Sequence, residues 1–177
     1  MKTLTSHITE ALKIGKDISK FSYYSYRPTS RDELKKIINE RISKEGFKCD
    51  LNDIDTSLIT DMTGLFYDSE FNGNISKWNT SNVKNMTWMF YNSRFDGDIS
   101  DWDVSKVEDM SYMFACSEFN QPIGDWDVSN VKNMVGMFKL SDFNQDISKW
   151  NVSDATAIFY MFDRCKIRKE YKPKLPL

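Results

Sequence analysis

Few residues in this chain have the types and spacing that catalysis needs. His7 is the only histidine, so nucleophilic chemistry of the Ser-His or Cys-His kind would depend on that single residue near the N-terminus. The three cysteines, Cys49, Cys116 and Cys165, form no Cys-x-x-Cys pair, which argues against a zinc site or a disulfide scaffold. The sequence therefore predicts a protein without catalytic residues, metal or cofactor.

Pairs of aspartates two residues apart are the arrangement closest to hydrolytic chemistry. The pairs are Asp53 and Asp55, Asp101 and Asp103, and Asp125 and Asp127. A glycosidase would place two such carboxylates across a cleft, and calcium would also need oxygen ligands. The pairs recur at a regular interval, however, and no insertion between them would build a cleft. A repeated structural role therefore explains them better than either activity.

The large side chains recur every 24 residues between Phe47 and Ile167. Self-similarity at a fixed period is the signature of a repeat protein. The same phase places Phe47 at a phenylalanine position and Ile54 at a tryptophan position. The recurring residues are Trp78, Trp102, Trp126 and Trp150; Phe71, Phe95, Phe119 and Phe143; Phe66, Phe90, Phe114, Phe138 and Phe162; and Ser57, Ser81, Ser105, Ser129 and Ser153.

Each unit predicts one very short strand and one short helix. The strand would surround Ile75, and a turn would follow it. The spacing of Val83, Met86 and Phe90 then places three apolar side chains on one face of a helix. A serine precedes this segment and is a natural N-cap. The serines expected to cap successive helices are Ser81, Ser105, Ser129 and Ser153.

Units this short cannot bury their apolar faces alone, whereas stacked copies can. The sequence therefore predicts an α/β repeat solenoid of five units over residues 47–167, in which equivalent side chains form ladders. The tryptophans would belong to the core ladders. A polar ladder would bond to the backbone of the turns, and it comprises Asp55, Asn79, Asp103, Asp127 and Asn151.

The two ends differ from the repeats. Residues 1–46 predict a helical segment and cap, in which Ser30 begins a helix whose face contains Leu34. We expect that face to cover the first repeat around Phe47 and Leu51. Residues 168–177 are rich in lysine and proline and predict a basic C-terminal cap or tail.

Charge and hydropathy restrict the partners. Residues 47–166 contain ten basic and nineteen acidic side chains, and an acidic body argues against nucleic acid. No run of 18 apolar residues exists, so no membrane span is expected. The start of the chain has no apolar stretch of signal-peptide length. These features predict a location in the cytoplasm.

The repeat resembles a known family. The unit N-x-x-x-M-F-x-x-S-x-F-N-x-D-I-S-x-W-D-V-S-x-V is similar to that of the BspA-like leucine-rich-repeat proteins, over residues 47–167. The resemblance implies a right-handed solenoid with strands inside and short helices outside. It also implies a non-catalytic module that binds proteins or other surfaces. Binding through the strand face would involve Asn74, Asp98 and Asp146.

Residues 24 apart occupy equivalent positions of the repeat, and we call such a set a column. Two outer columns differ in residue type from unit to unit, so they would determine the specificity for a partner. One reads Gly64, Trp88, Tyr112, Gly136, Tyr160, and its neighbour reads Tyr67, Tyr91, Ala115, Lys139, Asp163. Partly exposed rings in these columns would suit a protein partner or a surface glycan. Packing over neighbouring turns is the alternative explanation. Contacts between copies of the chain are also conceivable.

The first eleven residues suggest a second function. They resemble the capsid-targeting peptides of internal head proteins in tailed phages, which a head protease cleaves after a glutamate. The resemblance implies a virion structural protein that is processed between Glu10 and Ala11. The matching residues are Met1, Lys2, Thr3, Ile8, Glu10 and Ala11.

Overall fold

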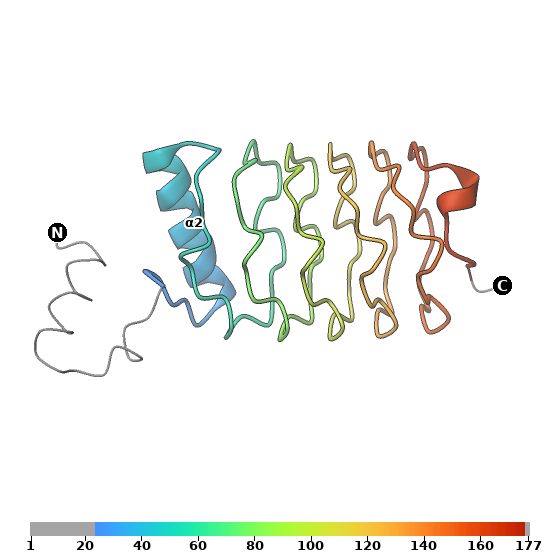
Figure 1. Cartoon of the computed structure of the whole chain (residues 1–177), viewed down its shortest axis with the longest axis horizontal. Helices are drawn as coiled ribbons and strands as arrows, with labels where there is room; N and C mark the ends of the chain where they lie inside the picture. The colour runs from blue at the N-terminus through green and yellow to red at the C-terminus, as the bar shows by residue number, and fades with distance from the viewer. Residues whose placement is uncertain (1–23, 176–177) are drawn as a thin grey trace, which may run out of the picture.

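The chain forms one stack of similar coils between two helical segments. A computed structural model describes residues 24–175, and within that range the helices are α2 (Arg31–Glu45) and the 3-10 helix η2 (Lys169–Tyr171). Figure 1 shows α2 at one end of the stack and η2 at the other. Neither of these two helices, the only ones in the described part, is long and apolar enough to cross a membrane.

Successive coils pair in parallel with a register of 24 residues. We call each 24-residue unit a coil. In each coil except the last, alternate amides donate to carbonyls 23 residues further along the chain, as from Phe66 to Met89 at 2.8 Å and from Phe90 to Met113 at 2.9 Å. Isolated parallel bridges mark the same register, and they join Asp50 to Asn74, Asp61 to Asn85, Asn85 to Asp109, Asp109 to Asn133, and Asn133 to Ala157. A further parallel bridge joins Tyr26 to Ile54.

The short helices expected in the second half of each repeat do not form. The amide of Met89 donates to the carbonyl of Met86, three residues back, and the amide of Phe90 donates to the next coil. An α-helix would use the carbonyl four residues back for both. Trp88 also has a φ of 54°, in the left-handed region that a right-handed helix excludes. This half of the coil is therefore a series of turns.

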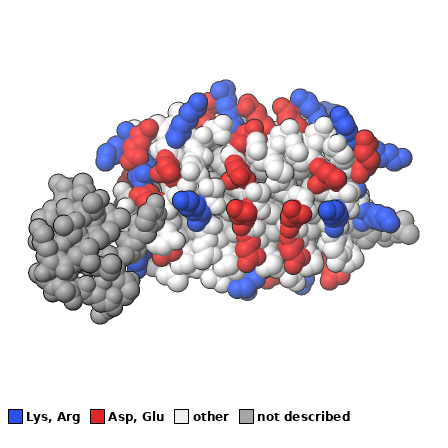
Figure 2. Space-filling model, in the orientation of Figure 1, with Lys and Arg blue, Asp and Glu red and all other residues white. Residues whose placement is uncertain are grey.

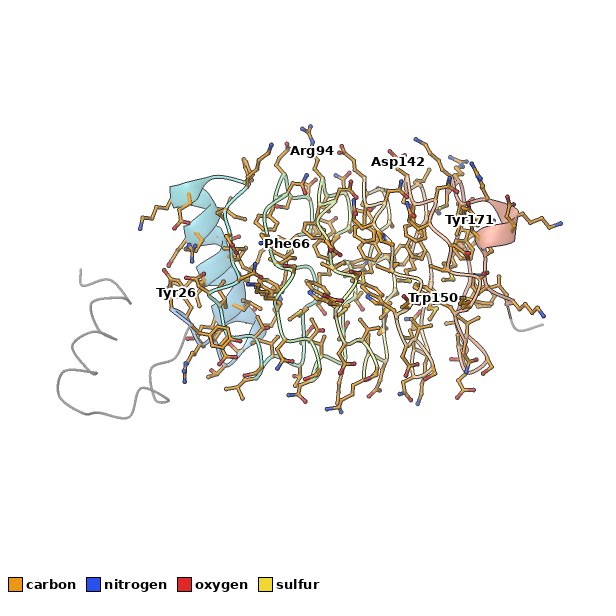
Figure 3. The ribbon with its side chains drawn as sticks, in the orientation of Figure 1. Tyr26, Phe66, Arg94, Asp142, Trp150 and Tyr171 are labelled. Carbon is orange, nitrogen blue, oxygen red and sulfur yellow. The ribbon has the colours of Figure 1, made fainter. Side chains whose placement is uncertain are left out.

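Aromatic ladders form the core of the stack. The rings of Phe66 and Phe90 are parallel within 1° at a centroid distance of 5.4 Å, and those of Trp78 and Trp102 within 3° at 6.3 Å. Each buried indole also donates to a backbone carbonyl 27 residues earlier, so its polar atom is satisfied. These bonds join Trp78 to Leu51, Trp102 to Ile75, Trp126 to Ile99, and Trp150 to Ile123. Figure 3 shows Phe66 and Trp150 inside the stack.

The serine ladder has another role than the one expected. The hydroxyl and the amide of Ser105 both donate to the carboxylate of Asp103, at 2.6 and 3.0 Å. No helix follows, so the serine closes an Asx turn instead of capping a helix. The expected bonding of the polar ladder to the turn backbone is confirmed in all five coils, where Asp55, Asn79, Asp103, Asp127 and Asn151 accept the amides of Ser57, Ser81, Ser105, Ser129 and Ser153.

Helix α2 covers the first coil with its apolar face. Leu34 and Ile38 are fully buried in the same core cluster as Leu51. The expectation that Phe47 also lies under this face is wrong, because its side chain is 51% exposed. Phe47 directly follows Gly46, which ends the helix, and so it lies beside the cap and has no preceding coil to pack against.

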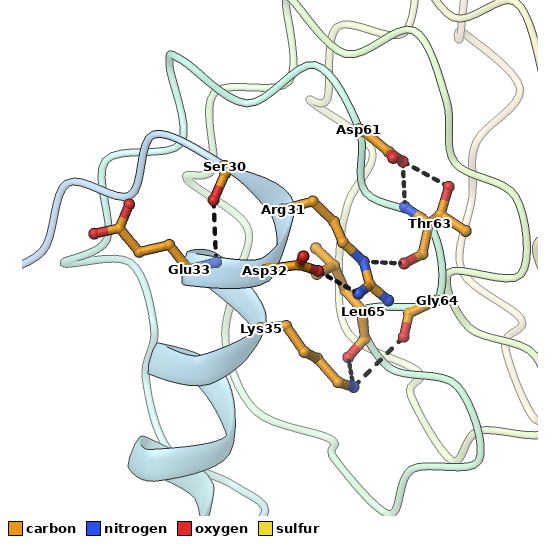
Figure 4. A network of polar contacts seen from close by, with 9 residues as sticks. All are labelled: Ser30, Arg31, Asp32, Glu33, Lys35, Asp61, Thr63, Gly64 and Leu65. Carbon is orange, nitrogen blue, oxygen red and sulfur yellow. Dashed lines mark hydrogen bonds and ion pairs between the residues drawn. The ribbon is translucent and has the colours of Figure 1, made fainter.

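Two cations of α2 take the place of a missing coil. Arg31 donates from Nε to the carbonyl of Thr63 at 2.9 Å, and the Lys35 ammonium donates to the carbonyl of Leu65 (Figure 4). In later coils the equivalent carbonyls, such as that of Thr87, accept amides of the coil before. The carbonyl end of the stack is therefore capped by side chains.

Candidate functional site

Four of the aromatic residues singled out from the sequence lie together on the outside of the stack. They line an open depression of about 480 Å³. The rings of Tyr67 and Tyr91 stack at a centroid distance of 5.0 Å and an angle of 7°. Tyr67 is 50% exposed and Trp88 is 45% exposed. We call this group the aromatic site, and it comprises Tyr67, Trp88, Tyr91 and Tyr112.

The backbone presents two of these rings from left-handed turn positions. Trp88 and Tyr112 each have a φ of 54°, and glycines occupy the same position in two sister coils, at φ 59° for Gly64 and 58° for Gly136. A left-handed residue with a Cβ costs about 1–2 kcal/mol. Glycine is thus the least strained residue at this position, and three coils carry large aromatic residues there instead, the third being Tyr160 at φ 60°.

Gly136 makes room for the ring of Tyr112. A Cβ atom built on Gly136 would lie 2.5 Å from Cε1 and 2.7 Å from Cδ1 of that ring. Real Cβ atoms do not approach other heavy atoms so closely, so only glycine leaves the ring in this place. Gly136 therefore bounds the aromatic site at the side of the next coil.

The phenol of Tyr91 holds its proton more tightly than an ordinary tyrosine, because its pKa is raised. The pKa of Tyr91 is raised, chiefly by the charge that the neighbouring Cys116 thiol carries when ionised, and also by a side-chain hydrogen bond with Cys116 and by burial. Of the four lining residues none is a carboxylate, an amine or an amide. The site is accordingly an uncharged surface of rings with hydroxyl and indole donors at their edges.

Tyr160 does not belong to the aromatic site, although it shares a column with Trp88. It is 66% exposed, and the Lys139 ammonium lies 5.2 Å from the centre of its ring. Lys139 also pairs with Asp163 at 3.3 Å. The neighbouring Phe159 is 68% exposed and was missed by the sequence reasoning. The sequence does mark Phe159 as unusual, because the equivalent positions of the other coils carry the smaller residues Thr63, Thr87, Ser111 and Val135.

The residues predicted for the strand face serve local turns. Asn74, Asp98 and Asp146 each accept the amide of the serine two residues later, at 3.2, 2.9 and 2.9 Å. The pKa of Asp98 is lowered mainly by the bond from the backbone amide of its serine and, second, by the bond from the serine hydroxyl. The same two bonds lower the pKa of Asp146. None of the three lines the depression of the aromatic site.

The remaining predicted positions contribute no reactive group to this site. The four tryptophans of the ladder are buried, and the serines belong to the turns already described. Within residues 24–175, no three His, Cys, Asp or Glu side chains are grouped as metal ligands. The predicted processing site at Glu10 and Ala11 lies outside the described residues, so it stays a prediction.

Comparison with known families agrees with a repeated unit. A family model described as "Mycoplasma protein of unknown function, DUF285" matches residues 33–141 and again residues 94–171. The two matches overlap and together span well over half of the chain. This chain belongs to the DUF285 family. A repeated unit lets one family model align with the chain at two overlapping positions. In this DUF285 chain the matched residues include most of α2 and the whole aromatic site.

No curated protein and no solved structure matches this DUF285 chain. Because the description of the family names no activity, the function has to be argued from the aromatic site and its surroundings.

Proposed function

We propose that this chain is a leucine-rich-repeat-like solenoid of the BspA-like type, and a non-catalytic module that binds a partner protein through the aromatic site. The observation that carries the proposal is the gathering of four partly exposed rings, Tyr67, Trp88, Tyr91 and Tyr112, around one depression. Exposed apolar patches of this kind mark interaction sites. Tryptophan and tyrosine are also the residues most enriched among those that dominate binding energy.

The backbone conformation supports a functional reason for these rings. Trp88 and Tyr112 occupy left-handed positions that Gly64 and Gly136 fill in sister coils. Stability alone would favour glycine at such a position. Strained residues concentrate where binding or catalysis requires them. Each coil also tolerates a second left-handed residue with a side chain, such as Asp68 at φ 52°, so the choice of large rings in the glycine column is what points to a contact with a partner.

The lining of the site favours a protein over a glycan. Sugar rings stack on aromatic residues, but their hydroxyl groups also need polar side chains placed around the ring. The four lining residues offer only phenol and indole groups. Such a surface matches an apolar side chain that protrudes from a partner protein, with the hydroxyl groups bonding at the rim.

The carboxylates that a glycosidase would use have structural partners instead. Asp103 accepts two hydrogen bonds from Ser105, and Asp127 accepts two from Ser129. These bonds lower the pKa of both carboxyl groups, whereas a general acid needs a raised pKa. This arrangement supports a binding function over hydrolysis.

The test compares partner capture by two variants. The double variant Trp88→Gly, Tyr112→Gly removes two rings and inserts the residue that sister coils already carry, so the backbone accepts it. The control is Leu58→Ala, which shortens a side chain that is 63% exposed elsewhere on the first coil. Proteins captured from extracts of the source organism would be identified, and the affinity of the purified partner would be measured by calorimetry.

We expect the double variant to bind the partner at least about tenfold more weakly, because each hot-spot ring contributes more than about 1 kcal/mol. The control should bind as tightly as the unmodified chain. A partner whose affinity is the same for all three proteins would refute the proposed role of the aromatic site.

A further inference from the structure

Within the described part of the chain, the last coil of the stack leaves a row of backbone amides without acceptors. The amides of Met134, Gly136, Phe138 and Leu140 donate to the carbonyls of Ala157, Phe159, Met161 and Asp163 at 2.7 to 2.9 Å. One coil further on, the equivalent amides find no acceptor among residues 24–175. We call this the open amide row, and it comprises the amides of Ile158, Tyr160, Phe162 and Arg164.

The C-terminal cap bonds to another part of the last coil, and it reaches the residues of the open amide row only at the ring of Phe162. The carbonyl of Tyr171 in η2 accepts the amide of Ile147 at 3.0 Å. Lys172 then places its ammonium 5.2 Å from the ring centre of Phe162. At the opposite end of the stack, Arg31 and Lys35 of α2 supply donors to the exposed carbonyls. Among residues 24–175, the open amide row has no such counterpart that supplies acceptors.

The row carries exposed aromatic residues, and the segment that follows it is basic, although Lys166 pairs with Asp142 at 2.6 Å. Phe159 and Tyr160 are the most exposed large apolar side chains of the described part of the chain, at 68% and 66%. Basic residues outnumber acidic ones between residues 163 and 175, and Figure 2 shows blue side chains at this end of the molecule. The basic residues are Arg164, Lys166, Arg168, Lys169, Lys172 and Lys174, against Asp163 and Glu170.

A second copy of the chain does not complement this surface. Two C-terminal ends would place amide donors against amide donors and cations against cations. The N-terminal end of another copy could offer carbonyls, but α2 covers that end, and its cations already occupy the carbonyls of Thr63 and Leu65 in the middle of that row. The complementary ligand must therefore present acceptors and negative charge, and it must come from a different molecule.

We propose that the C-terminal end of the stack binds an acidic, extended segment of a partner protein. Its backbone carbonyls and carboxylates accept hydrogen bonds from the open amide row, as in the addition of a strand to an exposed edge. The left-handed residues Tyr160 and Arg164 curve the row, and such alternating backbone binds anionic oxygens. The surrounding cations steer acidic segments to the row and disfavour basic ones.

This surface is separate from the aromatic site. The open amide row belongs to residues 158–164, whereas the aromatic site spans residues 67–112. Either interaction can therefore fail while the other holds.

The test follows the amides directly. The ¹⁵N-labelled full chain would be titrated by NMR with a synthetic peptide of alternating glutamate and valine. We expect saturable shifts of the four amides of the open row and no shift of their paired equivalents Met134, Gly136, Phe138 and Leu140. A peptide with lysine in place of glutamate should leave the row unchanged. An unchanged row with the acidic peptide, or shifts confined to Trp88 and Tyr112, would overturn the proposal.

A charge variant provides a second readout. Arg164→Glu should weaken binding of the acidic peptide about tenfold, since it replaces an attraction by a repulsion at the row. The matched control is Lys48→Glu, which makes the same change of charge beside the opposite end of the stack. Equal affinities of the two variants would contradict the proposal. So would binding of an oligothymidylate as tight as that of the peptide, or self-association of the free chain on a sizing column.

Discussion

Gly136→Ala tests the geometry of the aromatic site most sharply. The new Cβ atom would lie 2.5 Å from Cε1 of Tyr112, so the ring has to leave its place. The alanine would also adopt a φ of 58°. We expect about 1 kcal/mol lower stability from the left-handed backbone. Overpacking against the ring should add about 1–2 kcal/mol.

Gly64→Ala is the matched control, because it repeats the backbone strain without the collision. Its φ of 59° is nearly the same, but the nearest atoms to its Cβ would be Nη2 of Arg31 and Cβ of Tyr67, both at 3.7 Å. That is ordinary van der Waals contact. The control should therefore lose about 1 kcal/mol, and the difference between the variants measures the contact with Tyr112.

The assay is urea unfolding of both variants, followed by tryptophan fluorescence and circular dichroism. Stacked repeats can unfold in parts, so the two probes should coincide and the dependence on urea should be equal before the free energies are compared. Equal losses of stability would show that the ring of Tyr112 does not rest on Gly136. A loss in Gly64→Ala that exceeds that in Gly136→Ala would contradict the reasoning outright.

Two further predictions concern the cap and the turns. Lys35→Met should lower stability to urea by about 1–2 kcal/mol, because the carbonyl of Leu65 loses its donor; unchanged stability would show that the cap does not need this bond. The hydroxyl and then the amide of Ser129 hold the pKa of Asp127 below its ordinary value, so this carboxylate stabilises the fold above about pH 4 and the contribution disappears as the pH falls through the lowered pKa. Asp127→Asn, which copies Asn79 of a sister coil, should reduce the fall of the thermal midpoint between about pH 5 and pH 2, and an equally steep fall would count against this role.

Part of the aromatic site could be predicted from the columns of the repeat. In a stack, residues one period apart become neighbours, so the period by itself brings Tyr67 beside Tyr91 and Trp88 beside Tyr112. It could not separate Tyr160 from this group. That separation arises because Gly136 interrupts the column, and because Lys139 covers the ring of Tyr160.

The spacing within one unit was less informative than the spacing between units. Apolar residues three apart, such as Met86 and Met89, suit one face of a helix, but they also suit a turn closed by a bond from the amide of Met89 to the carbonyl of Met86. The sequence pattern favoured the helix, and the structure has the turn. The exposure of Phe47 was also hidden from the sequence pattern. Phe47 occupies the repeat position of the buried phenylalanines, but that position is buried only where a preceding coil packs against it.

The amino-acid sequence by itself determined the period, the identity of each column and the choice of Phe, Trp, Met and Val for the core, because these follow from side-chain recurrence. Only the tertiary structure decided the backbone of the turns and the different chemistry of the two ends. The physical reason is that the amide of Phe90 finds its acceptor 23 residues away, on Met113. Such a bond belongs to the stack and leaves no mark in the local spacing of either residue.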